Sequence, residues 1–112
     1  MGNVIEQIRL RRFAERKQQH SVALNHLLNE IQAICFYLDK RPIVEKKYKA
    51  PKVLEFLNEM KVPYIISNEI KNLFDRRNKN LVSHADSIAW LVSQAEYEDY
   101  HKAVGKCLKY IL

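Results

Sequence analysis

The sequence predicts an all-α protein, an up-and-down bundle of four to five helices. The chain of 112 residues contains only two Gly and three Pro, whereas an all-β fold needs a turn about every ten residues and carries more of both. Apolar residues make up 47% of the chain, which excludes a disordered protein. They recur at spacings of three and four, the period of an amphipathic helix. A chain of this length without a low-complexity stretch is predicted to form a single domain, residues 1–112.

The first forty residues are predicted to form one long helix, or two helices in line, ending before Pro42. The apolar stripe is looser at its start, because Lys17 and His20 stand where the period requires apolar residues. We therefore expect the first turns to project from the core or to pack on a partner. The regular part of the stripe consists of Leu24, Leu27, Leu28, Ile31, Ile34, Cys35 and Leu38.

Three further helices are predicted downstream. Pro51 is placed to open a short helix, and a longer helix is predicted over Tyr64–Asn78. Ser93 and Glu96 have the spacing of a capping box, which predicts the start of a last helix that continues to the end of the chain, Ser93–Leu112. The inward-facing residues of these helices are predicted to be Val53, Leu54, Leu57 and Met60, then Ile66, Ile70, Leu73 and Phe74, and finally Tyr100, Ala103, Val104, Cys107, Leu108 and Ile111.

The two cysteines indicate a reducing compartment. Cys35 and Cys107 each lie within an apolar stripe, and neither has a C-x-x-C partner, so both are expected to be buried thiols. No stretch approaches the roughly 18 uninterrupted apolar residues of a membrane span, and the first residues carry charge where a secretory signal is apolar. We therefore expect a cytoplasmic protein that does not enter membranes.

The basic residues are unevenly distributed. The formal net charge is +6, with 16 Lys/Arg against 9 Asp/Glu in residues 1–79 and 3 against 4 in the remainder. Such an excess suits a polyanionic partner, nucleic acid above all, although solvated faces that keep the protein soluble explain the charge equally well. The excess comes mainly from Arg9, Arg11, Arg12, Arg16 and Lys17, then Lys40, Arg41, Lys46, Lys47, Lys49 and Lys52, and then Lys71, Arg76, Arg77 and Lys79.

Two adjacent arginines end the helix predicted over Tyr64–Asn78. At about 100° per residue, Arg77 falls in the middle of the apolar face of this helix, while Arg76 lies at its polar edge. An arginine in the middle of an apolar stripe is costly unless it lines a cleft or meets an anionic partner. The other interpretation is that the helix ends by Arg77, or that its guanidinium reaches solvent at the terminus.

Asn78 follows Arg77, and six residues separate Arg77 from His84. This pattern, at the end of an apolar helix and before a Ser-capped last helix, resembles the arginine–histidine signature of the HEPN family (higher eukaryotes and prokaryotes nucleotide-binding). The resemblance covers nearly the whole domain. It implies a metal-independent endoribonuclease of toxin or defence type that cleaves RNA. It further implies a homodimer whose two Arg–His pairs meet across the two-fold axis, with an antitoxin or a nucleotidyltransferase-like protein as a partner.

The resemblance also assigns roles to residues. His84 is expected to act as general acid/base, because an imidazole titrates near neutrality. Arg77 is expected to clamp the phosphate, since a guanidinium offers a fixed, bidentate charge. Asn78 would orient His84 or the scissile phosphate, and Arg76 and Lys79 would hold flanking phosphates.

No metal or cofactor is expected, because no ligand set with a recognised spacing and no Gly-rich phosphate loop is present. His20, His26 and His101 lie on separate predicted helices and are expected to be surface or boundary residues. An alternative function is a non-catalytic helical interaction module that binds a partner protein or nucleic acid without cutting it.

Overall fold

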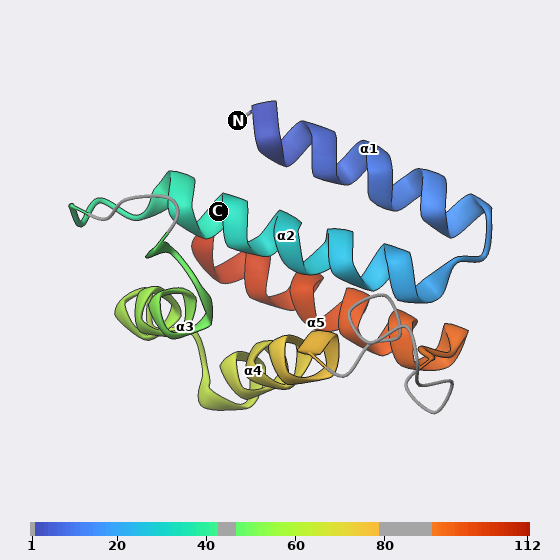
Figure 1. The fold of residues 1–112 in the computed structure, drawn as a ribbon. Coiled ribbons are helices and arrows are strands. Elements are labelled where there is room, and N and C mark those ends of the chain that lie inside the picture. Colours follow the sequence, from blue (N-terminus) through green and yellow to red (C-terminus); the bar gives the residue numbers. More distant parts are fainter. Residues whose placement is uncertain (1, 43–46, 79–90) are drawn as a thin grey trace.

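The computed structural model describes residues 2–42, 47–78 and 91–112, and five helices account for most of them (Figure 1). The predicted all-α bundle of four to five helices is confirmed. None of the helices in the described part of the chain is both long and apolar enough to cross a membrane. The helices are α1 (Gly2–Arg16), α2 (His20–Leu38), α3 (Ala50–Glu59), α4 (Tyr64–Asn78) and α5 (Gln94–Ile111).

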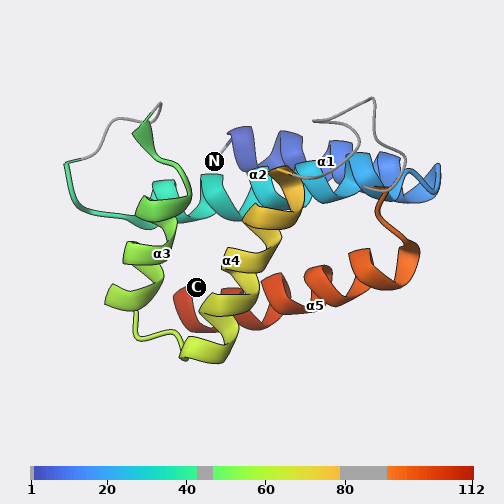
Figure 2. The ribbon, with the colours of Figure 1, turned by 60° about the horizontal axis from the view of Figure 1, so that its bottom comes forward.

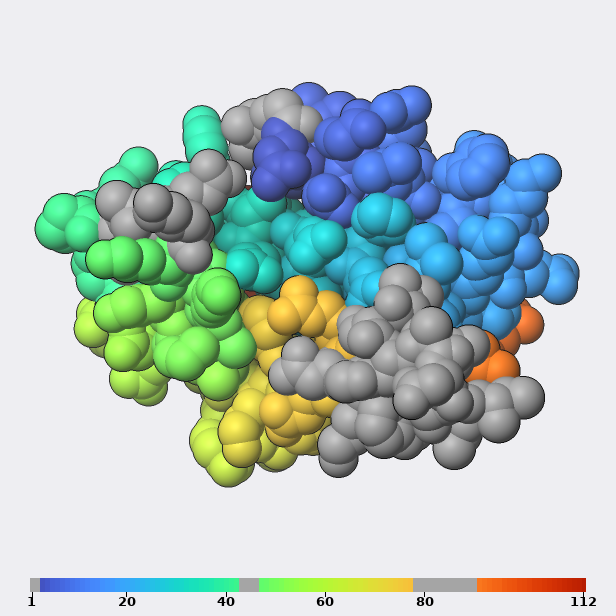
Figure 3. All heavy atoms as spheres, viewed as in Figure 1, coloured from blue at the N-terminus to red at the C-terminus, as the bar shows by residue number. Residues whose placement is uncertain are grey.

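Helix α2 lies at the centre and packs against each of the other four helices. It runs between α1 and α5 (Figure 1), and α3 and α4 cross it steeply (Figure 2). In the space-filling view, atoms of α2 are visible between those of α1 and α4 (Figure 3). The apolar stripe predicted for this helix is confirmed in its regular part, since the following residues are buried: Leu24, Leu27, Leu28, Ile31, Ile34 and Cys35.

The first forty residues form an antiparallel hairpin, so the prediction of one long helix, or two in line, is wrong (Figure 1). Gln18 adopts a left-handed conformation with φ 56°. The backbone N–H of Gln18 donates to the carbonyl of Glu15 at 3.0 Å, and that of Gln19 donates to the carbonyl of Ala14 at 2.9 Å. These two hydrogen bonds form a Schellman motif, which usually places Gly or Asn at the left-handed residue. The sequence did not predict this turn, because a glutamine occupies the position where Gly or Asn would indicate it.

A second Schellman motif ends α3. Lys61 has φ 60°, and the N–H of Val62 donates to the carbonyl of Leu57 at 3.0 Å. Leu57 and Val62 are both buried, which supplies the apolar contact that accompanies this motif. Because the chain turns at this point, Met60 is 39% exposed rather than inward-facing as predicted, and Phe56 fills the core beside Val53.

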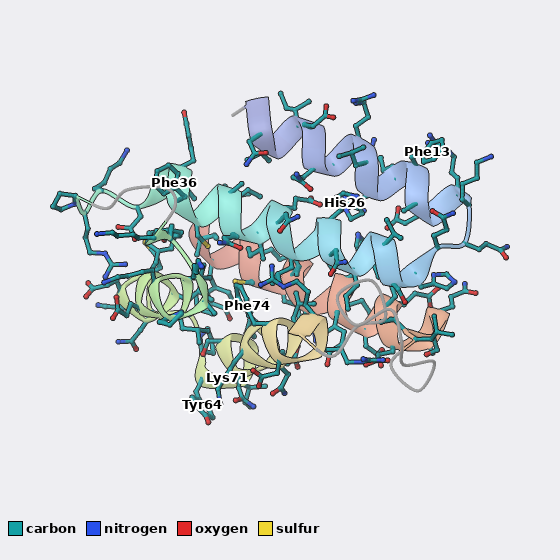
Figure 4. The ribbon with its side chains drawn as sticks, viewed as in Figure 1. Phe13, His26, Phe36, Tyr64, Lys71 and Phe74 are labelled. Atoms are coloured by element: carbon teal, nitrogen blue, oxygen red, sulfur yellow. The ribbon has the colours of Figure 1, made fainter. Side chains whose placement is uncertain are left out.

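The last two helices follow their predicted patterns. In α4, Ile70, Leu73 and Phe74 are buried, and Phe74 points toward α2 and α5 (Figure 4). The hydroxyl of Ser93 accepts a hydrogen bond from the N–H of Glu96 at 3.1 Å, which confirms the predicted cap of α5. The predicted stripe of α5 is also confirmed at its four most buried positions, Ala103, Val104, Cys107 and Ile111.

The connection after α2 is held by a buried carboxylate. The side chain of Asp39 accepts hydrogen bonds from Arg41 Nη2 at 2.6 Å and from the Tyr48 hydroxyl at 2.9 Å. The hydrogen bonds from Arg41 lower the pKa of Asp39 to about 2. This ion pair fixes the chain as it leaves α2, and the Tyr48 ring is fully buried beside Phe36.

We expect Gln18→Gly to stabilise the protein by about 1 kcal/mol, because glycine removes the steric cost of a left-handed residue. Thermal unfolding measures the change, and the midpoint should rise by about 4 °C. The matched control is Lys106→Gly at an exposed position within α5, where glycine should instead destabilise by about 1 kcal/mol. A loss of stability in Gln18→Gly would contradict the Schellman assignment.

Candidate functional site

The predicted site residues fall partly within the described structure. Arg76, Arg77 and Asn78 form the last turn of α4. The side chain of Asn78, together with Lys79 and His84, lies outside the described residues. The site is therefore described by its two arginines, and they have different surroundings.

Arg76 joins the end of α4 to the start of α5. Its Nε donates to Glu96 Oε2 at 2.6 Å, and its Nη2 donates to the carbonyl oxygen of Leu91 at 3.0 Å. Both partners belong to the chain segment that follows residues 79–90. These contacts return the chain at Leu91 to the carboxyl end of α4, the same end from which it leaves after Asn78.

Arg77 is half-buried and lies within α4, so the helix has not ended before it. Its guanidinium carbon is 6.0 Å from the centroid of the Phe74 ring, within the range of a cation–π contact. Burial lowers the pKa of Arg77 below its usual value. Within residues 2–42, 47–78 and 91–112, no carboxylate forms an ion pair with it.

Four other arginines differ from Arg77 in having an acidic partner. Arg9, Arg11, Arg41 and Arg76 each form an ion pair at 2.6–2.7 Å. Arg77 is thus partly buried and has no carboxylate as an ion-pair partner in the described part of the chain. A guanidinium in this state gains free energy from an incoming anion, because the anion supplies the charge and the acceptors that the protein does not.

A second polar cluster, which the sequence did not predict, joins α1 to α2 and α5. Arg11 Nε donates to Glu30 Oε2 at 2.6 Å, and its Nη1 donates to Glu15 Oε2 at 2.9 Å. Arg11 and Glu30 are 8% and 5% exposed. Burial alone would lower the Arg11 pKa, but hydrogen bonding to Glu30 and the charge of that carboxylate raise it above its usual value. Arg11 belongs to the basic excess of the sequence, but it is buried in an ion pair. It therefore contributes neither to a basic surface for a polyanion nor to a solvated face.

The same cluster continues into α5. The Tyr97 hydroxyl donates to Glu15 Oε2, and Arg11 Nη1 lies 3.2 Å from His101 Nε2. A guanidinium only donates hydrogen bonds, so a hydrogen bond at this contact requires Nε2 to be the acceptor. Burial would raise the pKa of Glu15, but the hydrogen bonds from Tyr97 and Arg11 lower it below its usual value.

A cleft of about 270 Å³ opens beside this cluster and brings two histidines together. The Tyr97 ring lies between them, with centroids 6.1 Å from His20 and 6.0 Å from His101. Sequence analysis placed these histidines on separate helices, and nothing in their spacing predicts that α2 and α5 bring them to one cleft. The described residues contain no group of three or more His, Cys, Asp or Glu side chains arranged to hold a metal ion.

We expect Arg11→Met to lower the free energy of unfolding by about 3 kcal/mol or more, because it leaves Glu30 buried without its partner. The double variant Arg11→Met/Glu30→Leu should recover much of that loss, since an apolar pair replaces the ion pair. Urea denaturation measures both. Arg12→Met, at the adjacent exposed position, is the control and should change stability by less than about 0.5 kcal/mol. Equal effects at Arg11 and Arg12 would contradict the buried ion pair.

Comparisons with protein-family models, curated proteins and solved structures found no match for the chain. Membership of the HEPN family therefore stays a prediction from the pattern of Arg77, Asn78 and His84. To this sequence pattern the structure adds the fold and the surroundings of Arg76 and Arg77.

Proposed function

We propose that the chain is a metal-independent endoribonuclease of HEPN type, with Arg77 as the phosphate clamp and His84 as the general acid/base. One observation carries the proposal. Arg77 is half-buried at the carboxyl end of α4, and no carboxylate among the described residues pairs with it. A phosphodiester supplies the anion that this arginine lacks.

Cleavage of RNA by this pair follows from the chemistry of the two side chains. The 2′-oxygen loses its proton to an imidazole and attacks phosphorus, the bond to the 5′-oxygen breaks, and a protonated imidazole returns a proton to that oxygen. The products carry a 2′,3′-cyclic phosphate and a 5′-hydroxyl. The guanidinium of Arg77 stabilises the charge that develops on the phosphorane oxygens. Asn78 orients His84 or the scissile phosphate, and Arg76 and Lys79 hold flanking phosphates.

A homodimer completes the site, because two proton transfers at different oxygens are best served by two imidazoles. Two-fold pairing of α4 would place two copies of Arg77 and His84 around one phosphate. Helix α4 has an outer side on which Tyr64 and Ile65 are 79% and 74% exposed. Tyr64 and Lys71 project from this side, away from the other helices (Figure 4). In the described part of the chain, no helix covers this outer side near the start of α4.

The alternative is a helical interaction module that binds a partner protein or nucleic acid without cutting. The exposed apolar side chains at the start of α4 favour it, since an antitoxin or a nucleotidyltransferase-like protein could cover Tyr64 and Ile65. A protein that binds RNA but leaves it intact would support this alternative over the ribonuclease.

We expect Arg77→Ala to reduce the cleavage rate of a fluorescent RNA by about 10²-fold or more, as the loss of an oxyanion-stabilising donor does. Arg77→Lys should not restore the rate, because a point charge lacks the bidentate fork. His84→Ala should be inactive. Cleavage by the wild-type protein should persist in EDTA and yield a 2′,3′-cyclic phosphate.

Arg76→Ala is the matched control, since it removes the same charge one residue away. It breaks the bonds to Glu96 and Leu91, so it should lower thermal stability and weaken RNA binding while the folded protein still cuts. Circular dichroism confirms that each variant is folded before rates are compared. Normal cleavage by Arg77→Ala, with an inactive Arg76→Ala that is folded, would reverse the assignment of the two arginines.

The proposed dimer predicts a solution mass of about two chains at micromolar concentration, measured by light scattering. Ile65→Glu, which puts a charge on the exposed side of α4, should shift the mass toward one chain and lower the cleavage rate with it. Lys106→Glu on the exposed side of α5 is the control and should leave the mass unchanged. A wild-type mass of one chain would contradict the shared site.

A further inference from the structure

The side of α1 that faces away from α2 carries an exposed aromatic ring among cations. Phe13 is 53% exposed and lies at the outer edge of the molecule, near the end of α1 (Figure 4). The Arg16 guanidinium carbon and the Lys17 Nζ lie 6.0 Å and 5.7 Å from its ring centroid. Arg12 is exposed one residue before the ring. We call Arg12, Phe13, Arg16 and Lys17 the Phe13 face.

The exposure of this ring follows from how α1 packs. The buried positions of α1 are Val4, Arg11 and Ala14, and the helical period then directs Phe13 away from α2. The acidic residue nearest in sequence, Glu15, is turned inward and accepts hydrogen bonds from Arg11 and Tyr97. The Phe13 face therefore carries three cations, and the exposed carboxylate nearest to it along this side of α1, Glu6, is paired with Arg9 at 2.7 Å.

We infer that the Phe13 face binds single-stranded RNA, with one base stacked on the Phe13 ring and the adjoining phosphates held by Arg12, Arg16 and Lys17. Sequence-tolerant binding of single strands combines these two elements, an aromatic platform and surrounding positive charge. The inference rests on the proposed function for the choice of RNA as the nucleic acid. It adds a substrate-binding surface outside the pair of Arg77 and His84.

The composition of the face favours RNA over a membrane surface. An amphipathic helix that enters a bilayer presents a broad apolar face. On the outer side of α1, Phe13 and Ile5 are the large apolar residues. The exposed Arg12 and the ion pair of Arg9 with Glu6 lie between them in the sequence. Cations in the middle of the face suit phosphates on either side of a stacked base.

Binding is tested with the full chain and a fluorescein-labelled 2′-O-methyl oligouridine of about twelve nucleotides, which cannot be cleaved by 2′-oxygen attack. Fluorescence anisotropy gives the Kd. Phe13→Ala should weaken binding about tenfold, the loss of one stacked base, and Phe13→Tyr should keep it. Arg16→Glu/Lys17→Glu should weaken it further and reduce the dependence of binding on salt. Lys106→Glu/Lys109→Glu makes the same charge change on the exposed side of α5 and should have a much smaller effect.

The outcomes separate this inference from the proposed function. Wild-type binding by Phe13→Ala, together with loss of cleavage in Arg77→Ala, would overturn the inference and leave the ribonuclease intact. If Phe13→Ala loses RNA binding and the wild-type protein does not cleave RNA, the result would support the inference and contradict the ribonuclease. Equal losses of RNA binding in the α1 and α5 charge variants would overturn the inference about the Phe13 face. Binding of the protein to phosphatidylserine vesicles, without binding to the oligonucleotide, would also overturn it.

Discussion

The breadth of the buried face of α2 determines how the other helices are arranged. Nine residues of α2 are buried, and at about 100° per residue they cover roughly half of its circumference. A single neighbouring helix cannot cover a face of that width, because helix pairs contact along a narrow strip. The four other helices therefore all pack on α2, two of them roughly along it and two across it (Figure 2).

The packing of α1 on α2 relies on polar contacts as well as on apolar residues. Its inner side holds Val4 and Ala14, but also Arg11, which pairs with Glu30 of α2. The amide oxygen of Gln7 accepts a hydrogen bond from Nδ1 of His26 at 2.8 Å, and His26 lies on the side of α2 that faces α1 (Figure 4). A buried ion pair adds little net stability yet is costly to separate. It therefore specifies the position of α1 on α2 more than it strengthens the fold, and it directs Phe13 outward.

The two adjacent arginines at the end of α4 make different contacts. Arg76 is bonded to Glu96 and Leu91, so it holds the start of α5 against α4. Arg77, about 100° further around the helix, rests against Phe74 and has no carboxylate partner among the described residues. The first contact positions the chain on either side of residues 79–90, and the second leaves a positive charge at the same end of α4. The end of α4 is thus held in place by Arg76, and it carries a guanidinium without a carboxylate partner among the described residues. The proposed phosphate clamp rests on this arrangement.

Local patterns in the sequence determined the helical segments, most of the core positions and the place of Arg77 on its helix. These features depend on neighbours within one or two turns, and the apolar period and the Ser93 cap record them directly. The chain reversal at Gln18 was not predicted from the sequence, because the hydrogen bonds that hold its left-handed backbone are made by main-chain groups, which any residue supplies. The partners of Arg11 and Arg76 lie 19 and 20 residues away, and His20 of α2 and His101 of α5 both line one cleft beside Tyr97. Only the tertiary structure decided these pairings, because two side chains that are distant in sequence meet only when packing brings their helices together.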